Sequence, residues 1–393
     1  MPNDPDRTGR ATKSGENVNR RLTAVLTGAC AALIMLAGAQ AAGAAGKTVT
    51  ITGKAYVFGH MDTPISNAPI KVREFPKLTA TTDEIGDYKL KVPNEANVTP
   101  YIPSGEGLLT RRNLDDYSPK DEDKVQTHWN EIDLQTFHPR GQNLVNVNFQ
   151  VPVDPEYAGL KAILSVQADP DGRNTNCAIV TTASVRNVRD VNYAKFESET
   201  ARLHGHGVPG ASAIGYPALG EPIYFTEQTI PLPTQKETSL DGGIVWTEVP
   251  PGTYRVVTTS KTDRFASFLA TCKPRRVVNA NPPWGAYQLT KGEKPLGASN
   301  VAGSVISAKA TRKGKIGRYG TVVLKAGENL NAAVTLKAGG GAVTKSLKLK
   351  PGTRKVRVNV DFRRKWKKAN MVVRLKDASG VSITTKKKIF LRS

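Results

Sequence analysis

The stretch Asp241–Val257, DGGIVWTEVPPGTYRVV, combines two turn signals with two apolar runs. Asp241-Gly242-Gly243 marks the first turn. Pro250-Pro251-Gly252 marks the second, because proline and glycine suit the two central positions of a type II turn. Ile244, Trp246 and Val249 supply apolar strand positions after the first turn, and Tyr254, Val256 and Val257 resume the strand after the second. The stretch therefore predicts a β-hairpin inside an all-β fold.

A similar pattern occurs earlier in the chain. Thr79–Val92, TATTDEIGDYKLKV, places a turn at Asp83–Gly86 and an alternating strand beyond it. Thr48–Phe58 and Ala68–Glu74 are further predicted strands, and Asn143–Val151 returns to strict alternation and is expected to complete the sheet. A short helix is predicted over 154–168. The chain thus contains two related β units.

Both units resemble the carboxypeptidase regulatory-like domain, a small transthyretin-like β-sandwich with the pattern G-x-V…G-A-x-V…T-x-x-x-G-x-Y-x-F…P-x-G-x-Y. The first copy matches in Pro64–Val72 and Thr82–Tyr88, and the second in Asp241–Val257. Asn67 stands in place of the usual glycine, and Pro93-Asn94 replaces the closing motif. The resemblance implies two sandwiches, at 48–155 and 160–290, that hold or present a ligand.

The stretch Pro103–Gly141 interrupts the first unit with glycine, proline and charge, including Asp121-Glu122-Asp123. We predict a long, solvated acidic loop at 103–141. Calcium binding is the alternative, but the carboxylates lack the spacing and the glycine of an EF-hand loop.

Residues 1–46 have the composition of an export signal. Basic residues precede an apolar run, Leu22–Leu36, and small residues follow at Ala39–Ala44. A retained membrane anchor is the alternative. We predict a secreted or cell-envelope protein, with no transmembrane helix after removal of the signal.

Removal of the signal leaves two cysteines, Cys177 and Cys272. An even pair in an exported chain predicts a disulfide, with two buried free thiols as the alternative. No cysteine-based zinc site is then expected.

The last domain differs in charge from the rest. Residues 296–393 contain 24 Lys and Arg and 3 Asp and Glu, so they carry nearly all of the chain's net charge of +22. Alternating strands separated by Gly-rich turns indicate a basic immunoglobulin-like or fibronectin-like sandwich at 298–393, after a linker at 291–297.

So positive a domain is expected to attract polyanions. The expected partners are an anionic polymer or polysaccharide of the cell envelope, another envelope protein, and nucleic acid only where it is extracellular. The alternative is a solvated surface whose lysines prevent edge-to-edge aggregation. The densest basic runs give the candidate polyanion-binding residues: Arg363, Arg364, Lys365, Trp366, Lys367, Lys368, Lys386, Lys387 and Lys388.

His204 and His206, with Tyr157 and Tyr193 upstream, resemble the two-tyrosine, two-histidine iron set of intradiol ring-cleavage dioxygenases. Leu203 replaces the proline that usually precedes those histidines. A His-x-His pair without its structural context is a weak motif, so surface or turn histidines are preferred, and no metal or cofactor is expected.

The sequence lacks the hydrolase, phosphate-loop and dinucleotide motifs. It therefore predicts an exported, non-enzymatic binding or scaffold protein. A carbohydrate-binding protein is the second hypothesis, which exposed aromatics at Trp129, Trp246 and Trp284 would favour. An intradiol-type dioxygenase is the third.

Overall fold

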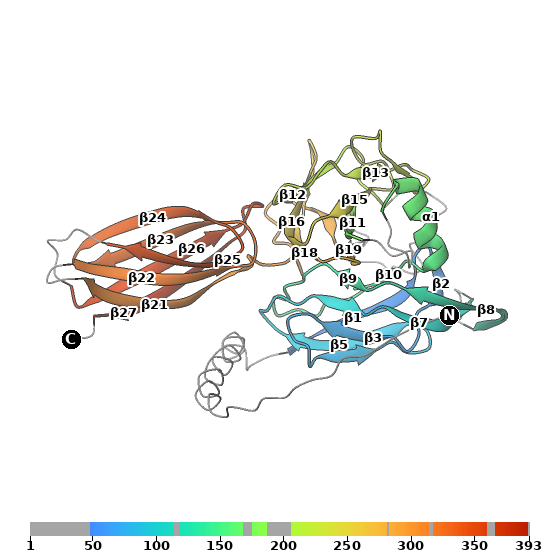
Figure 1. Cartoon of the computed structure of the whole chain (residues 1–393), viewed down its shortest axis with the longest axis horizontal. Helices are drawn as coiled ribbons and strands as arrows, with labels where there is room; N and C mark the ends of the chain where they lie inside the picture. Colours follow the sequence, from blue (N-terminus) through green and yellow to red (C-terminus); the bar gives the residue numbers. More distant parts are fainter. Residues whose placement is uncertain are drawn as a thin grey trace, which may run out of the picture. The chain divides into compact units, whose positions relative to one another are not determined.

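The computed structural model describes residues 48–113, 118–167, 175–186, 206–280, 283–313, 317–359 and 366–391. The predicted signal, 1–46, lies outside these residues. The described chain is all-β with one short helix, and its strands form tandem β-sandwiches, which confirms the predicted fold class (Figure 1).

The first unit begins with a strand that pairs on both sides. β1 lies antiparallel to β5 and parallel to β10 in one layer, while β3, β6 and β9 pair in the other. The strands of this unit are β1 (Thr48–Val57), β2 (His60–Pro64), β3 (Pro69–Val72), β4 (Thr79–Thr81), β5 (Asp87–Pro93), β6 (Pro100–Ile102), β7 (Gly105–Arg112), β8 (Pro119–Trp129), β9 (Ile132–Leu134) and β10 (Phe149–Val151).

The second unit repeats this arrangement after helix α1 (Asp154–Leu164). β11 lies antiparallel to β15 and parallel to β20, while β12, β16 and β18 pair in the other layer. The strands are β11 (Cys177–Ser184), β12 (Ser212–Tyr216), β13 (Ile223–Phe225), β14 (Pro231–Leu232), β15 (Gly243–Val249), β16 (Gly252–Thr259), β17 (Arg264–Phe265), β18 (Phe268–Cys272), β19 (Val277–Ala280) and β20 (Ala286–Leu289).

A buried threonine fixes the same turn in both units. In the first, the Thr82 hydroxyl accepts a hydrogen bond from Ala68 N at 2.8 Å and donates to Ile65 O at 2.7 Å. In the second, the Thr238 hydroxyl accepts from Ala211 N at 2.9 Å. It donates to Val208 O, three residues before that alanine, at 2.6 Å. The two units therefore form the same pair of threonine hydrogen bonds at this turn.

A glycine four residues after each threonine completes the shared structure. Gly86 and Gly242 have φ angles of 80° and 77°. Their carbonyls accept from Ala55 N and Ala183 N, each at 2.9 Å. A Cβ on Gly86 would lie 2.4 Å from the Ala55 carbonyl oxygen, so the T-x-x-x-G spacing reflects both a positive φ and a close backbone approach.

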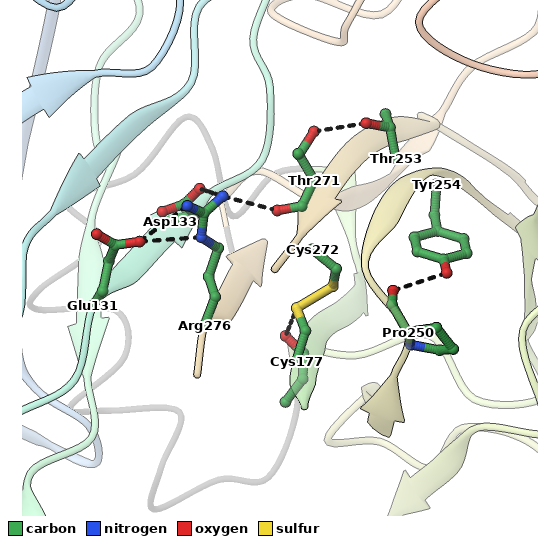
Figure 2. Close-up of a disulfide and its surroundings, with 10 residues drawn as sticks. Glu131, Asp133, Cys177, Pro250, Thr253, Tyr254, Thr271, Cys272 and Arg276 are labelled. Carbon is green, nitrogen blue, oxygen red and sulfur yellow. Dashed lines mark hydrogen bonds and ion pairs between the residues drawn. A yellow bond between two sulfur atoms is a disulfide. The ribbon is translucent and has the colours of Figure 1, made fainter. Parts of the chain in front are cut away.

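The hairpin predicted at Asp241–Val257 is wrong. β15 pairs with β11 and β13, whereas β16 pairs with β12, β17 and β18, so the two strands lie in different layers. Pro250-Pro251 supplies no N–H groups to close a ladder, and the Tyr254 hydroxyl donates to Pro250 O at 2.9 Å across the corner (Figure 2). The same crossing occurs between β4 and β5, because β4 pairs with β3 and β5 with β1.

The predicted disulfide is present. Cys177 begins β11 and Cys272 ends β18, and their Cα atoms are 5.5 Å apart (Figure 2). Because these strands belong to different layers, the bridge joins the two layers of the second unit.

The acidic loop predicted at 103–141 is mostly strand. β7 and β8 form an antiparallel ribbon whose register runs from Gly105 opposite Trp129 to Arg112 opposite Pro119. The Trp129 side chain covers Gly105 and Gly107, which explains why glycines occur in this strand. Charge and glycine content concealed the strand, because a two-stranded ribbon needs little apolar sequence.

The core of the first unit includes residues from the second. Val277, Trp284, Tyr287 and Leu289 are buried in the same cluster as the side chains of β1, β3 and β5. β9 also pairs in parallel with β19. At this junction Arg276 contacts Asp133 and Glu131, each at 3.0 Å (Figure 2). The predicted bounds 48–155 and 160–290 therefore do not separate two independent cores.

The third sandwich packs a three-stranded sheet, β21-β22-β25, against a four-stranded sheet, β24-β23-β26-β27, around one apolar cluster. Its strands are β21 (Gly303–Lys313), β22 (Gly317–Ala326), β23 (Leu330–Ala338), β24 (Gly341–Leu349), β25 (Gly352–Val358), β26 (Lys368–Lys376) and β27 (Ser382–Phe390).

The predicted linker, 291–297, is held by packed partners. The Tyr287 hydroxyl donates to Leu296 O at 2.7 Å, and Arg140 donates to Pro295 O at 3.2 Å. Beyond it, the guanidinium of Arg255 in β16 pairs with Glu328 and Asp377 of the third sandwich. All three side chains are buried.

Candidate polyanion-binding face

The third sandwich directs its basic side chains outward by strand alternation. In β26, Ala369, Met371, Val373 and Leu375 are buried, while the residues between them point away from the core. The neighbouring strands keep the same phase. Basic residues therefore gather on the outer surface of the four-stranded sheet.

We call this surface the lysine face. The strand register places Lys337 opposite Asn370, and Asn370 opposite Lys388. Lys386 lies two residues before Lys388 on β27. Lys368 pairs with Phe390 at the end of the sheet. The face consists of Lys337, Lys348, Lys368, Arg374, Lys376, Lys386, Lys388 and Phe390, all of them exposed.

Acidic side chains do not neutralise this face. Residues 296–393 contain three carboxylates, Glu328, Asp361 and Asp377. Glu328 and Asp377 are buried with Arg255, and Asp361 lies outside the described residues. In the part of this sandwich that the structure describes, the exposed charge is therefore entirely positive.

A hollow of about 780 Å³ lies at one end of the lysine face. Lys337, Lys368, Lys388 and Phe390 line it together with the turn between β23 and β24. That turn is Gly339-Gly340, with φ angles of 54° and 76°, as a type I′ hairpin turn requires. Because these glycines carry no side chains, the hollow stays open beside the lysines.

The basic runs predicted from the sequence are only partly brought together. Arg363, Arg364 and Lys365 lie outside the described residues. Lys386 and Lys388 share the lysine face, whereas Lys387 lies opposite buried Met371 and so points to the other side of the sheet. Lys367 is exposed before β26 begins, and Lys368 is the first residue of that strand.

Trp366 does not offer a stacking surface, contrary to its inclusion among the binding residues. It is 4% exposed and belongs to the core of the third sandwich. A large aromatic ring contributes more by burying its apolar area than by standing exposed on a small domain.

Phe390 is not among the binding residues predicted from the sequence. It is 63% exposed and is the most exposed large apolar side chain among the described residues. The signal was available in the sequence as Lys386-x-Lys388-x-Phe390, a period of two. Sequence proximity had instead suggested the run Lys386-Lys387-Lys388.

The three tryptophans that would favour a carbohydrate site are buried. Trp129, Trp246 and Trp284 donate their indole N–H groups to backbone carbonyls at 3.1, 3.0 and 3.0 Å. These three residues therefore lack the exposure that would favour a carbohydrate-binding protein, because each ring packs into a core with its polar edge satisfied.

The candidate iron residues are only partly described. Tyr193 and His204 lie outside the described residues, and Tyr157 lies in helix α1. His206 is half-buried, and burial lowers its pKa while Asp241 partly opposes this effect. Within the described ranges, no group of three or more His, Cys, Asp or Glu side chains is arranged to hold a metal ion. The iron set stays an untested alternative to surface or turn histidines.

The described residues include no helix that is both long and apolar enough to cross a membrane. A disulfide is typical of proteins that fold in an oxidising compartment.

No protein-family model and no curated protein sequence matches the chain. Among solved structures, a DUF3823 family protein from Bacteroides ovatus is 11% identical, with a TM-score of 0.18 over 46% of this chain and 100% of its own. A tetra-tandem repeat from the extending region of a large adhesion protein is 10% identical, with a TM-score of 0.20 over 87% of this chain and 74% of its own.

A Ca²⁺-stabilised adhesin with which an Antarctic bacterium binds ice is 12% identical, with a TM-score of 0.18 over 87% of this chain and 73% of its own. All three TM-scores are far below 0.5. What the strands themselves establish is an all-β protein of tandem β-sandwiches with a disulfide in the second unit.

Proposed function

We propose that this is an exported, non-enzymatic binding or scaffold protein of the cell envelope, whose third sandwich attaches it to an anionic polymer. One observation carries the proposal: the exposed charge of the described third sandwich is entirely positive, because Glu328 and Asp377 are both buried. Uncompensated cations on one flat face attract a polyanion at long range and release its counterions on binding.

We further propose that the first and second units are related to carboxypeptidase regulatory-like domains and present a partner surface. The shared hydrogen bonds of Thr82 and Thr238, and the positive φ angles of Gly86 and Gly242, support a common origin for the two. Their T-x-x-x-G spacing coincides with the corresponding part of that family's pattern.

Deleting residues 296–393 is an unsuitable test, because it removes both carboxylate partners of buried Arg255. Neutralising charges avoids this problem. In one variant all seven basic residues of the lysine face are changed to Gln. In the control, seven exposed lysines of the first two units are changed to Gln: Lys77, Lys89, Lys91, Lys124, Lys261, Lys273 and Lys291.

Retention of both variants on an anionic polymer column is measured over a series of salt concentrations. The lysine-face variant is expected to elute at much lower salt than the wild type, and the control variant close to it. Equal elution of all three proteins would contradict the proposal and leave the lysines as a solvated surface.

Metal content tests the non-enzymatic part of the proposal. We expect the purified protein to contain no stoichiometric iron. Iron that is present in the wild type and lost in His206→Ala would instead favour the dioxygenase hypothesis.

A further inference from the structure

We propose that the hollow beside Gly339-Gly340 binds an acidic polysaccharide, with a carboxylate or sulfate group held by Lys337, Lys368 and Lys388 and a sugar ring stacked on Phe390. This inference rests on the proposed function and specifies its ligand. The lysines and Phe390 line the same hollow, which makes one binding site of them.

The geometry of the sheet sets the spacing of the charges. Lys337 and Lys388 occupy one cross-strand row with Asn370 between them, so their Cα atoms are about 10 Å apart, two strand spacings. Lys368 lies two residues further along β26, opposite Phe390. Cations spread over this distance along the sheet suit an extended, repeating anion better than a single small one.

Phe390 gives the site its preference for rings. Lys368 and Phe390 are a directly opposed cross-strand pair, so their Cβ atoms are about 5 Å apart. An aromatic ring that is 63% exposed next to a lysine offers an apolar face to the C–H side of a sugar, while the ammonium group meets an acidic substituent.

The same features disfavour the other polyanions. A polyphosphate has no ring to place on Phe390. Single-stranded nucleic acids are bound by platforms on which two or three aromatics stack successive bases, whereas the strands of the lysine face contain one aromatic. Duplex DNA is read by an element that enters a groove, and the lysine face is the outer surface of a four-stranded sheet.

The test measures affinities of the full-length protein for polygalacturonate, inorganic polyphosphate and oligothymidylate at several salt concentrations. Phe390→Ala tests the ring contact, and Phe390→Trp restores it. The double variant Lys337→Gln/Lys388→Gln tests the charges. Its matched control is Lys309→Gln/Lys355→Gln on the three-stranded sheet, where both lysines are exposed.

We expect Phe390→Ala to weaken polygalacturonate binding about tenfold without changing its salt dependence, and to leave polyphosphate binding unchanged. Phe390→Trp should bind as the wild type does. Lys337→Gln/Lys388→Gln should reduce the slope of log affinity against log salt by about two, and its control should reduce it far less.

Three results would overturn the inference while leaving polyanion attachment intact: equal loss in both lysine pairs, wild-type affinity of Phe390→Ala for polygalacturonate, or a larger loss by Phe390→Ala on oligothymidylate. Absence of any salt-sensitive binding by the wild type would overturn the proposed function itself.

Discussion

The guanidinium of Arg255 and the carboxylate of Glu328 form two charge-assisted hydrogen bonds, at 2.7 and 2.8 Å, and both side chains are withdrawn from solvent. Seventy-three residues separate them in the sequence. Asp377 lies 3.2 Å from the same guanidinium. The same carboxylate of Glu328 also accepts from Ala302 N at 2.7 Å. The segment that leads into the third sandwich is thus held by a buried ion pair.

Glu328→Gln is expected to destabilise the protein by about 3 kcal/mol, because removal of one partner leaves a buried charge that is poorly compensated. Thermal and urea unfolding measure this change. Glu221→Gln is the matched control, since Glu221 pairs with Lys236 at 2.9 Å on the exposed surface. That change should cost less than about 1 kcal/mol. Equal losses in the two variants would show that the Arg255 pair is not buried.

Reduction of the Cys177–Cys272 bridge should destabilise the second unit by about 4 kcal/mol, because the bridge closes a long loop in the unfolded chain. Differential scanning calorimetry with and without a reducing agent measures the effect. The third sandwich contains no cysteine, so its own transition serves as an internal control. A second-unit transition that does not respond to reduction would argue that the bridge is absent.

Thr82→Val and Thr238→Val should each destabilise the protein by about 1–3 kcal/mol, because each leaves a buried backbone N–H and a buried carbonyl without their partner. The two losses should add in the double variant if the sites are independent. Exposed Thr79→Val is the control and should change stability by less than about 0.5 kcal/mol. Unequal losses at Thr82 and Thr238 would mean that the two turns contribute differently in spite of their shared bonds.

His138 should make stability fall as the solution is acidified. Burial lowers the pKa of His138, and the positive charge of Arg140 lowers it further, while Glu95 partly opposes both. The unfolded state therefore binds the proton more readily, so stability is lost as pH falls below the ordinary histidine pKa of about 6.5. The loss stops once the pH is below the folded-state pKa of His138.

His138→Gln keeps a side chain that can hydrogen bond with Asn97, and it should flatten the dependence of stability on pH between neutral and mildly acidic solution. Urea unfolding at a series of pH values measures this. Burial also lowers the pKa of His206, so part of the slope should persist in the variant. An unchanged slope would assign the whole effect to other groups.

Strand content was accessible from the sequence because alternation is a local property. Thr48–Phe58 was predicted from its pattern, and β1 spans Thr48–Val57. Pairing is not local. The sequence of Asp241–Val257 does not indicate that β15 and β16 lie in different layers. That depends on the strands with which they pair, β11, β12, β13, β17 and β18, which come from other parts of the chain.

The candidate site shows the same division. The excess of lysine in the last domain was evident, but the lysine face depends on cross-strand register, which brings Lys337 into one row with Lys388 from 51 positions later. The period of two in Lys386-x-Lys388-x-Phe390 indicates the exposure of Phe390, whereas the burial of Trp366 depends on packing in the third sandwich, which its neighbouring lysines do not indicate.

The parallel pairing of β9 with β19 has a consequence for the order in which the protein is completed. Glu131 and Arg276, which meet at this junction, are separated by 145 residues. At a synthesis rate of about 5–20 residues per second, the edge at β9 waits about 7–30 s for the strand that covers it. During that interval the first unit has an open β edge and lacks Trp284 and Tyr287 from its core. The first unit can therefore complete its core and cover its β9 edge only after residues 277–289 have been made.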